Sequence, residues 1–145
     1  MHSGFYFSSR IGLVVILLDH TIVHFEIPAN DIEKLKQFYI DLFGWTMEKY
    51  PGPTTYYLVG TVPVDEKTMM PIRPGVIGGL YNRKDASMPE MAKQTNYISV
   101  ESVEEYSKKI EALGGKIVLP KMEIPGIGWW ALALDPEGNN FGILE

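Results

Sequence analysis

The sequence of 145 residues contains no cysteine. Disulfide bonds, cysteine-ligated zinc and thiol chemistry are therefore excluded. The sequence also lacks a basic run, because its 13 Lys and Arg residues are scattered among 18 Asp and Glu residues, for a formal net charge of −5. Nucleic-acid-binding domains usually carry a basic patch or stripe. We therefore expect no nucleic acid among the partners of this chain.

An apolar run long enough to cross a bilayer is also missing. The longest run, IGLVVILL at 11–18, falls well short of the roughly 20 residues that a spanning helix needs. Arg10 precedes it, as in a signal peptide, but no cleavage pattern of small residues follows. We expect no membrane partner and a cytoplasmic location. Residues 1–20 are predicted to form an N-terminal extension, an extra strand or arm buried against the domain or a partner subunit; the alternative is an unnatural extension from a misplaced start codon.

The stretch 22–45 predicts a strand followed by a helix. Alternation along the strand packs its apolar side chains on the helix and points His24 and Glu26 away from it. Asn30 or Asp31 can cap the helix, and Gly44 is a typical C-terminal stop. Apolar side chains then recur along one side of the helix at Ile32, Leu35, Phe38, Tyr39 and Leu42.

The same pattern returns in the second half of the chain. When Ile27 is placed on Ile98, the glycine stops Gly44 and Gly115 also coincide, and each copy has its own capping box. Agreement in phase favours an internal duplication, although any two amphipathic helices share part of this pattern. Further strands are predicted at 46–50, 54–60, 75–81, 95–100, 116–119, 128–134 and 139–144.

These elements predict one domain at 21–145. It consists of two repeats, 21–82 and 94–145, joined by a linker at 83–93. Within the first repeat, residues 61–74 read as a long loop, of a kind that often forms a lid or a pocket wall.

Residues 21–145 resemble the vicinal oxygen chelate superfamily, which includes glyoxalase I, bleomycin-resistance proteins and extradiol dioxygenases. The matching pieces are VHFEIPANDIEKLKQFYIDLFGW, GVIGGLYN, and IEALGGKIV through the final DPEGNNFGILE. The resemblance implies an α+β fold of paired βαβββ units, which form a curved, half-barrel mixed sheet with the helices outside. It also implies a ligand cleft between the repeats and a homodimer, because many members build or complete the cleft across two chains.

Enzymes of this superfamily usually hold a divalent metal ion through four ligands on the first and last strand of each repeat. The matching positions here are His24, Gly78, Thr95 and Gly142, so one ligand of four survives. Because such an ion needs three or four His or carboxylate donors, we expect no family-type metal site and no other cofactor. Glu26 shares the strand face of His24, which leaves a shifted metal site as an alternative.

The predicted ligand site gathers the side chains that alternation places in the cleft. His24 and Glu26 have two interpretations. A carboxylate beside an imidazole could form a general base, or the histidine could be a buried remnant of a metal-binding ancestor. Tyr56 or Tyr57 and Trp129 or Trp130 could form walls, and we take the second of each pair. The full predicted set is His24, Glu26, Tyr57, Gly78, Leu80, Thr95, Tyr97, Trp130, Asn140 and Gly142.

The sequence therefore predicts a metal-independent, glyoxalase-like protein that binds a small, partly aromatic organic molecule in its cleft. It is either a lyase- or isomerase-like enzyme or a sequestering protein of the drug-resistance kind, so enzymatic activity is left open. Two alternatives remain. One is a metal-dependent glyoxalase or dioxygenase with an atypical ligand set, and the other is a structural or interaction module without a ligand.

Overall fold

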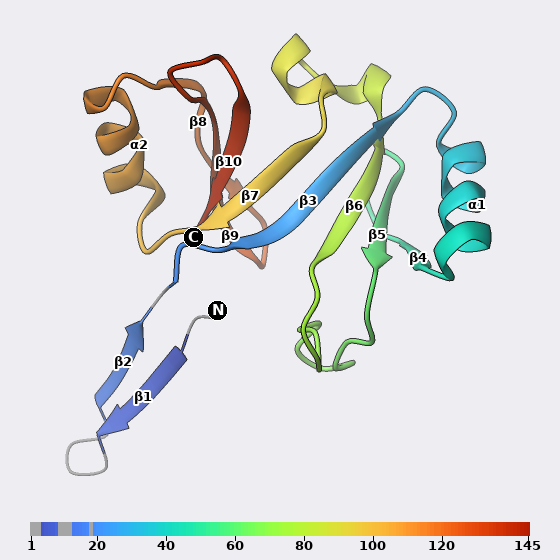
Figure 1. The fold of residues 1–145 in the computed structure, drawn as a ribbon, viewed down its shortest axis with the longest axis horizontal. Helices are drawn as coiled ribbons and strands as arrows, with labels where there is room; N and C mark the ends of the chain where they lie inside the picture. The colour runs from blue at the N-terminus through green and yellow to red at the C-terminus, as the bar shows by residue number, and fades with distance from the viewer. Residues whose placement is uncertain (1–3, 9–12, 18) are drawn as a thin grey trace. The chain divides into compact units, whose positions relative to one another are not determined.

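A computed structural model describes residues 4–8, 13–17 and 19–145. The chain divides into two compact units, which we call the α1 unit, residues 23–96, and the α2 unit, residues 1–22 with 97–145. Each unit contains a sheet with one helix packed on one face (Figure 1). This arrangement confirms the predicted α+β fold class.

The sheet of the α1 unit has the strand order β4–β5–β6–β3. β3 (Ile22–Ala29) pairs parallel with β6 (Ile77–Asn82). β5 (Tyr56–Gly60) pairs antiparallel with β6 on one side and with β4 (Thr46–Lys49) on the other. β3 and β4, which precede and follow the first helix in sequence, are thus not neighbours in the sheet, because β3 lies next to β6.

α1 (Ile32–Phe43) begins and ends where local signals predict. Asp31, rather than Asn30, is the N-cap, and its Oδ1 accepts the Lys34 backbone N–H at 3.1 Å. Gly44 ends the helix in the left-handed conformation, with φ 68°, which a residue with a side chain rarely adopts. The core between helix and sheet contains Ala29, Ile32, Tyr57, Val59 and Leu80.

The α2 unit repeats this order of elements. β10 (Asn140–Leu144) pairs parallel with β7 (Thr95–Ser99) and antiparallel with β9 (Gly128–Leu134), and β8 (Lys116–Ile124) pairs with β9 at the edge. α2 (Val103–Ala112) packs on this sheet through a core of Val100, Val103, Ala131 and Ile143. The order strand, helix, three strands therefore occurs twice, as the self-alignment predicts.

In the N-terminal extension, β1 (Gly4–Ser8) and β2 (Leu13–Leu17) pair as an antiparallel hairpin. β2 comes from the predicted apolar strand or arm at 11–18, of which residues 11, 12 and 18 lie outside the described residues. Its burial against the domain or a partner stays a prediction. In the part of the chain that the structure describes, no helix is long and apolar enough to span a membrane.

The predicted linker folds into two 3-10 turns, η1 (Arg83–Asp85) and η2 (Pro89–Ala92). Arg83 fixes this segment to the rest of the α1 unit. Its Nη1 donates to Asn30 Oδ1 at 2.8 Å, at the end of β3, and its Nε donates to the Ala92 carbonyl oxygen at 3.2 Å. The linker is thus held against the sheet by charge-assisted hydrogen bonds.

Candidate functional site

The sheet of the α1 unit has one face under α1 and one helix-free face. Strand register decides which side chains share the helix-free face, because paired residues point to the same side. Glu26 on β3 lies opposite Gly79 on β6, and Tyr56 on β5 lies opposite Tyr81 on β6. His24 is two residues before Glu26 and points the same way. These five residues form the candidate site.

Three of these side chains meet through one phenol. Tyr56 Oη donates to Glu26 Oε2 at 2.7 Å, and His24 Nε2 lies 3.0 Å from the same Oη and 3.7 Å from Oε2. An ionised carboxylate only accepts hydrogen bonds, so the phenol proton points to Glu26 and the phenol oxygen accepts from His24 Nε2–H. The neutral form of His24 is therefore the Nε2–H tautomer. We call these residues the His24–Tyr56–Glu26 trio.

Gly79 makes room for the trio. A Cβ at this position would overlap Oη and Cζ of Tyr56. A glycine is therefore needed here for the Tyr56 ring to cross β6 and reach between His24 and Glu26.

Tyr81 connects the same face to the linker. Its Oη donates to the carbonyl oxygens of Met91 and Lys93. Burial, helped by the nearby Glu26 carboxylate, raises the pKa of Tyr81 from 10.0 to about 12, while Arg83 acts in the opposite direction. The phenol thus stays protonated and holds the linker carbonyls beside the trio.

This shift predicts a loss of stability at alkaline pH. The pKa of Tyr81 is about 12 in the folded protein and 10.0 in the ordinary state, so the folded protein keeps a proton that the unfolded chain loses. The stabilisation is complete below about pH 10 and is lost as the pH rises through about 12. We expect Tyr81→Phe to reduce this alkaline loss by about 1–2 kcal/mol, allowing for solvent screening. Urea unfolding at about pH 9 and about pH 11.5 measures the fall in the free energy of unfolding between the two pH values, with Tyr50→Phe as the matched control. A fall that is the same in Tyr81→Phe as in the original chain would contradict this prediction.

The predicted placement of Gly78 and Leu80 in the site is wrong. They pair in register with Phe25 and Ile27, which point toward α1. Leu80 is 0% exposed in the core, and a Cβ at Gly78 would lie 2.5 Å from the Phe25 ring. The sequence GVIGG did not indicate which of its residues face α1, because glycine has no side chain from which to read the alternation. The glycine that faces away from α1 is Gly79.

The choice of Tyr57 over Tyr56 is also wrong. Tyr57 is buried under α1, where its Oη donates to Glu33 Oε1 at 2.5 Å and accepts from Lys36 Nζ at 3.4 Å. Hydrogen bonds from Lys36 and then Tyr57 lower the pKa of Glu33. Counting back in steps of two from the buried Val59 would have put Tyr57 on the helix side and Tyr56 in the site.

The other predicted residues lie on β7, β9 and β10. Tyr97 lies opposite Gly142, where a Cβ would overlap its ring, and the Tyr97 and Trp130 rings are 6.2 Å apart at 62°. Asn140 lies two residues before Gly142 on the same strand. Thr95 is buried, at 4% exposed, and its Oγ1 donates to the backbone carbonyl two residues earlier. Their part in ligand binding stays a prediction.

The donors present do not fit a family-type metal site. Among residues 19–145, no three His, Cys, Asp or Glu side chains lie where they could hold one metal ion. Of the family's ligand positions only His24 carries such a donor, since Gly78 and Gly142 have no side chain and Thr95 is a hydroxyl residue. Glu26 adds one carboxylate, whose Oε2 accepts a hydrogen bond from the phenol of Tyr56.

Comparison with known sequences gives matches to one group of proteins. Residues 21–58 match the family described as bleomycin resistance protein-like N-terminal. The anthracycline biosynthesis protein DnrV of Streptomyces peucetius is 28% identical over 127 residues, which cover 82% of this chain and 44% of that protein. A glyoxylase-like domain-containing protein of Didymella fabae is 29% identical over 132 residues, which cover 88% of this chain and 95% of that protein. This chain thus spans less than half the length of DnrV.

Solved structures share the fold. A glyoxalase/bleomycin resistance protein/dioxygenase superfamily member from Vibrio splendidus 12B01 superimposes with a TM-score of 0.56 and 15% identity, over 87% of this chain and 98% of that chain. At this identity the likeness concerns the fold alone. The matched N-terminal segment and the glyoxylase-like relative agree with the predicted resemblance to the vicinal oxygen chelate superfamily.

Proposed function

We propose that this protein binds a small, partly aromatic organic molecule at the His24–Tyr56–Glu26 trio. The observation that carries the proposal is the phenol of Tyr56, held between an imidazole and a carboxylate on a helix-free sheet face. The side chains of His24 and Glu26 are 20% and 22% exposed, so they are largely withdrawn from water yet still reachable. A few convergent polar groups in apolar surroundings are the usual form of a small-molecule site.

The surroundings of the trio favour an aromatic ligand that carries hydroxyl or carbonyl groups. The rings of Tyr50 and Tyr56 lie 6.3 Å apart at 77°, an edge-to-face pair beside the polar groups. A ligand hydroxyl can donate to Glu26, and a ligand carbonyl can accept from a phenol or an imidazole. The relative DnrV, described as an anthracycline biosynthesis protein, supports the same class of ligand.

The trio also has the chemistry for proton transfer. When His24 is protonated, its Nε2 can give a proton to the phenol oxygen while Glu26 takes the phenol proton of Tyr56, so that one proton passes from the imidazole to the carboxylate. A lyase- or isomerase-like enzyme would use this transfer on its substrate, whereas a sequestering protein would only hold the ligand. Turnover that is lost in His24→Ala supports the enzyme, and binding without turnover supports sequestration.

The proposal is tested by a pair of neighbouring tyrosine variants. Binding of a panel of hydroxylated aromatic compounds, an anthracycline among them, is first screened by thermal shift and then titrated calorimetrically. We expect Tyr56→Phe to weaken binding about ten- to a hundredfold, because it removes the hydroxyl group that positions His24 and Glu26 for the ligand. Tyr57→Phe should leave binding unchanged and lower the melting temperature, since its Oη serves Glu33 under α1.

Two results would overturn the proposal. One is an affinity that Tyr56→Phe does not change, and the other is a panel in which no compound raises the melting temperature. A ligand at 100 times its Kd should stabilise the protein by about 2.7 kcal/mol, so binding is readily detected.

A metal-dependent glyoxalase-like activity is the second candidate function. It would need an atypical ligand set, and its support is the donor pair His24 and Glu26, 3.7 Å apart, in a chain similar to a glyoxylase-like domain-containing protein of Didymella fabae. Elemental analysis of the purified protein separates the two candidates. Stoichiometric nickel, zinc or iron that is lost in His24→Ala supports the second candidate, and metal-free protein that still binds the aromatic ligand supports the first.

A further inference from the structure

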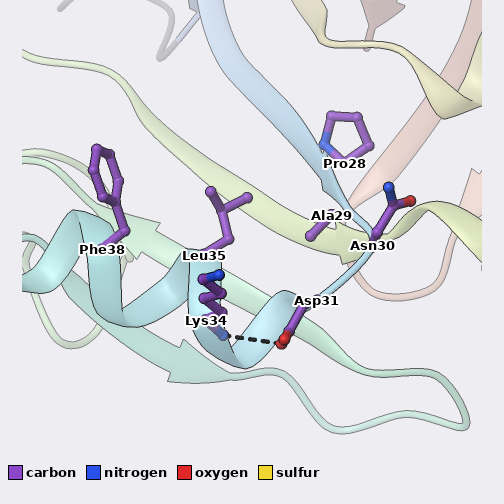
Figure 2. A pocket seen from close by; sticks show the side chains of 7 residues that line it. All are labelled: Pro28, Ala29, Asn30, Asp31, Lys34, Leu35 and Phe38. Atoms are coloured by element: carbon purple, nitrogen blue, oxygen red, sulfur yellow. Dashed lines mark hydrogen bonds between the residues drawn. The ribbon is translucent and has the colours of Figure 1, made fainter.

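An open hollow of about 390 Å³ lies between the end of β3 and the first turns of α1. Figure 2 shows Leu35 and Phe38 extending from α1 on one side of it, with Pro28 and Ala29 at the end of β3 on the other. Small-molecule sites usually have volumes of about 300–1,000 Å³. The hollow borders α1, whereas the trio lies on the helix-free face, so the two are separate places on the α1 unit.

Four apolar side chains form the body of the hollow. Ala29 is 4% exposed and belongs to the core under α1, and Leu35 is half-buried against the same core, so both provide a fixed floor. Pro28 is also buried, whereas Phe38 is 55% exposed and can still be covered by a ligand. A ligand with one aromatic ring or a branched aliphatic chain would therefore remove apolar surface from water here.

Asn30 places a hydrogen-bond donor at the rim of the hollow. Its Oδ1 accepts from Arg83 Nη1 at 2.8 Å. Because a guanidinium group has donors only, the amide atom of Asn30 that faces Arg83 must be the oxygen. The Nδ2 group is left to donate, and no residue in the described part of the chain accepts from it.

Lys34 and Asp31 bring opposite charges to the same rim. Asp31 Oδ1 accepts the Lys34 backbone N–H at 3.1 Å, but the Lys34 ammonium group forms no ion pair within residues 19–145. By contrast, Lys36 on the same helix is already paired with Glu33 at 2.7 Å. Lys34 Nζ and the second carboxylate oxygen of Asp31 are therefore both available to a ligand.

We propose that the hollow binds an α-amino acid with an apolar side chain. The carboxylate of the amino acid accepts from Lys34 Nζ and Asn30 Nδ2, its ammonium group donates to Asp31, and its side chain lies between Phe38 and Pro28. A plain carboxylic acid fits less well because Asp31 repels it, and a plain amine fits less well because Lys34 repels it. Only a ligand with both charges satisfies the whole rim.

Modified ligands test the two charged contacts on the full chain. L-phenylalanine is titrated while the backbone amide signals are followed by nuclear magnetic resonance, and the signals of the residues that line the hollow should shift. L-phenylalaninamide lacks the carboxylate and N-acetyl-L-phenylalanine lacks the ammonium group, so each should bind about five- to tenfold more weakly. These compounds also separate a free amino acid from a peptide terminus, which carries only one of the two charges.

Variants of the charged residues should show the matching selectivity. Lys34→Met removes the ammonium group and should weaken L-phenylalanine about five- to tenfold without weakening L-phenylalaninamide, which has no carboxylate to lose. Asp31→Asn should weaken L-phenylalanine to a similar extent without weakening N-acetyl-L-phenylalanine. Because asparagine caps a helix about as well as aspartate, α1 should stay folded in this variant.

The controls separate this site from general effects of charge and from the trio. Lys108→Met makes the same change at an exposed position of α2 and should leave every affinity unchanged. Tyr56→Phe should also leave L-phenylalanine binding unchanged, so failure of this site and failure of the trio are distinguishable. A chain that does not bind L-phenylalanine, shifts confined to residues away from the hollow, or a Lys34→Met variant that weakens all three compounds equally would overturn the proposal.

Discussion

Replacing Leu80 by alanine is expected to lower the free energy of unfolding by about 2–5 kcal/mol. Leu80 is 0% exposed and packs with Tyr57 and Val59 in the core beneath α1. The truncation removes buried apolar contacts and leaves a cavity that a close-packed interior fills only in part. Urea unfolding followed by circular dichroism measures the change, and the midpoint should fall with little change in slope.

The matched control for this substitution is Leu113→Ala at the end of α2. Leu113 is 81% exposed, so its loss should change the free energy of unfolding by less than about 0.5 kcal/mol. Leu80→Ala should also retain its affinity for the aromatic ligand wherever it is folded. Weakened binding with unchanged stability would indicate that Leu80 faces the ligand, and it would contradict the register of β6.

Gly79→Ala is expected to remove the His24–Tyr56–Glu26 trio. The added Cβ would overlap Oη and Cζ of Tyr56, so the ring must leave its place between His24 and Glu26. We expect the affinity for the aromatic ligand to fall at least as far as in Tyr56→Phe. Displacing the ring should also lower the free energy of unfolding by about 1–3 kcal/mol, the typical cost of overpacking.

Gly52→Ala is the comparison for that experiment, because a Cβ at Gly52 meets no atom within 4 Å. It should change neither affinity nor stability appreciably. A Gly79→Ala protein that binds the ligand as tightly as the original chain would show that the position of Tyr56 is unimportant.

The helices could be predicted from the sequence because their limits depend on local groups. Asp31 accepts a backbone N–H of the first turn, and Gly44 supplies a left-handed residue at the end. Both effects act within a few residues, so the local sequence is enough to predict where the helix begins and ends. The duplicated order of elements was predictable for the same reason, because it repeats these signals in phase.

Tyr56 and Gly79, the other part of the site, could not be predicted from the sequence. His24 and Glu26 follow from alternation on β3, but their partner Tyr56 comes from another strand, through a pairing that no local pattern specifies. The adjacent tyrosines 56 and 57 look alike, and only the register with Leu80 separates them. The two glycines 78 and 79 likewise give no alternation from which to count.

The hydrogen bonds that attach the linker to the sheet could not be predicted from the sequence either. Tyr81 and Arg83 bind backbone carbonyls of residues 91–93, and carbonyl acceptors are the same at every position of a chain. Side chain to backbone bonds of this kind depend on the path of the loop. They become visible only when the linker has been placed.

The hydrogen-bond chain through Tyr56 is tested most directly by nuclear magnetic resonance of the imidazole nitrogens. The chain has 3 histidines, which makes assignment straightforward. His24 should be the Nε2–H tautomer because it donates to Tyr56, whereas His20, whose Nδ1 lies 3.0 Å from the Ser99 carbonyl oxygen, should be the Nδ1–H tautomer. Tyr56→Phe should shift the His24 signals and leave those of His20 in place. A His24 ring protonated on Nδ1, or one indifferent to Tyr56→Phe, would contradict the account.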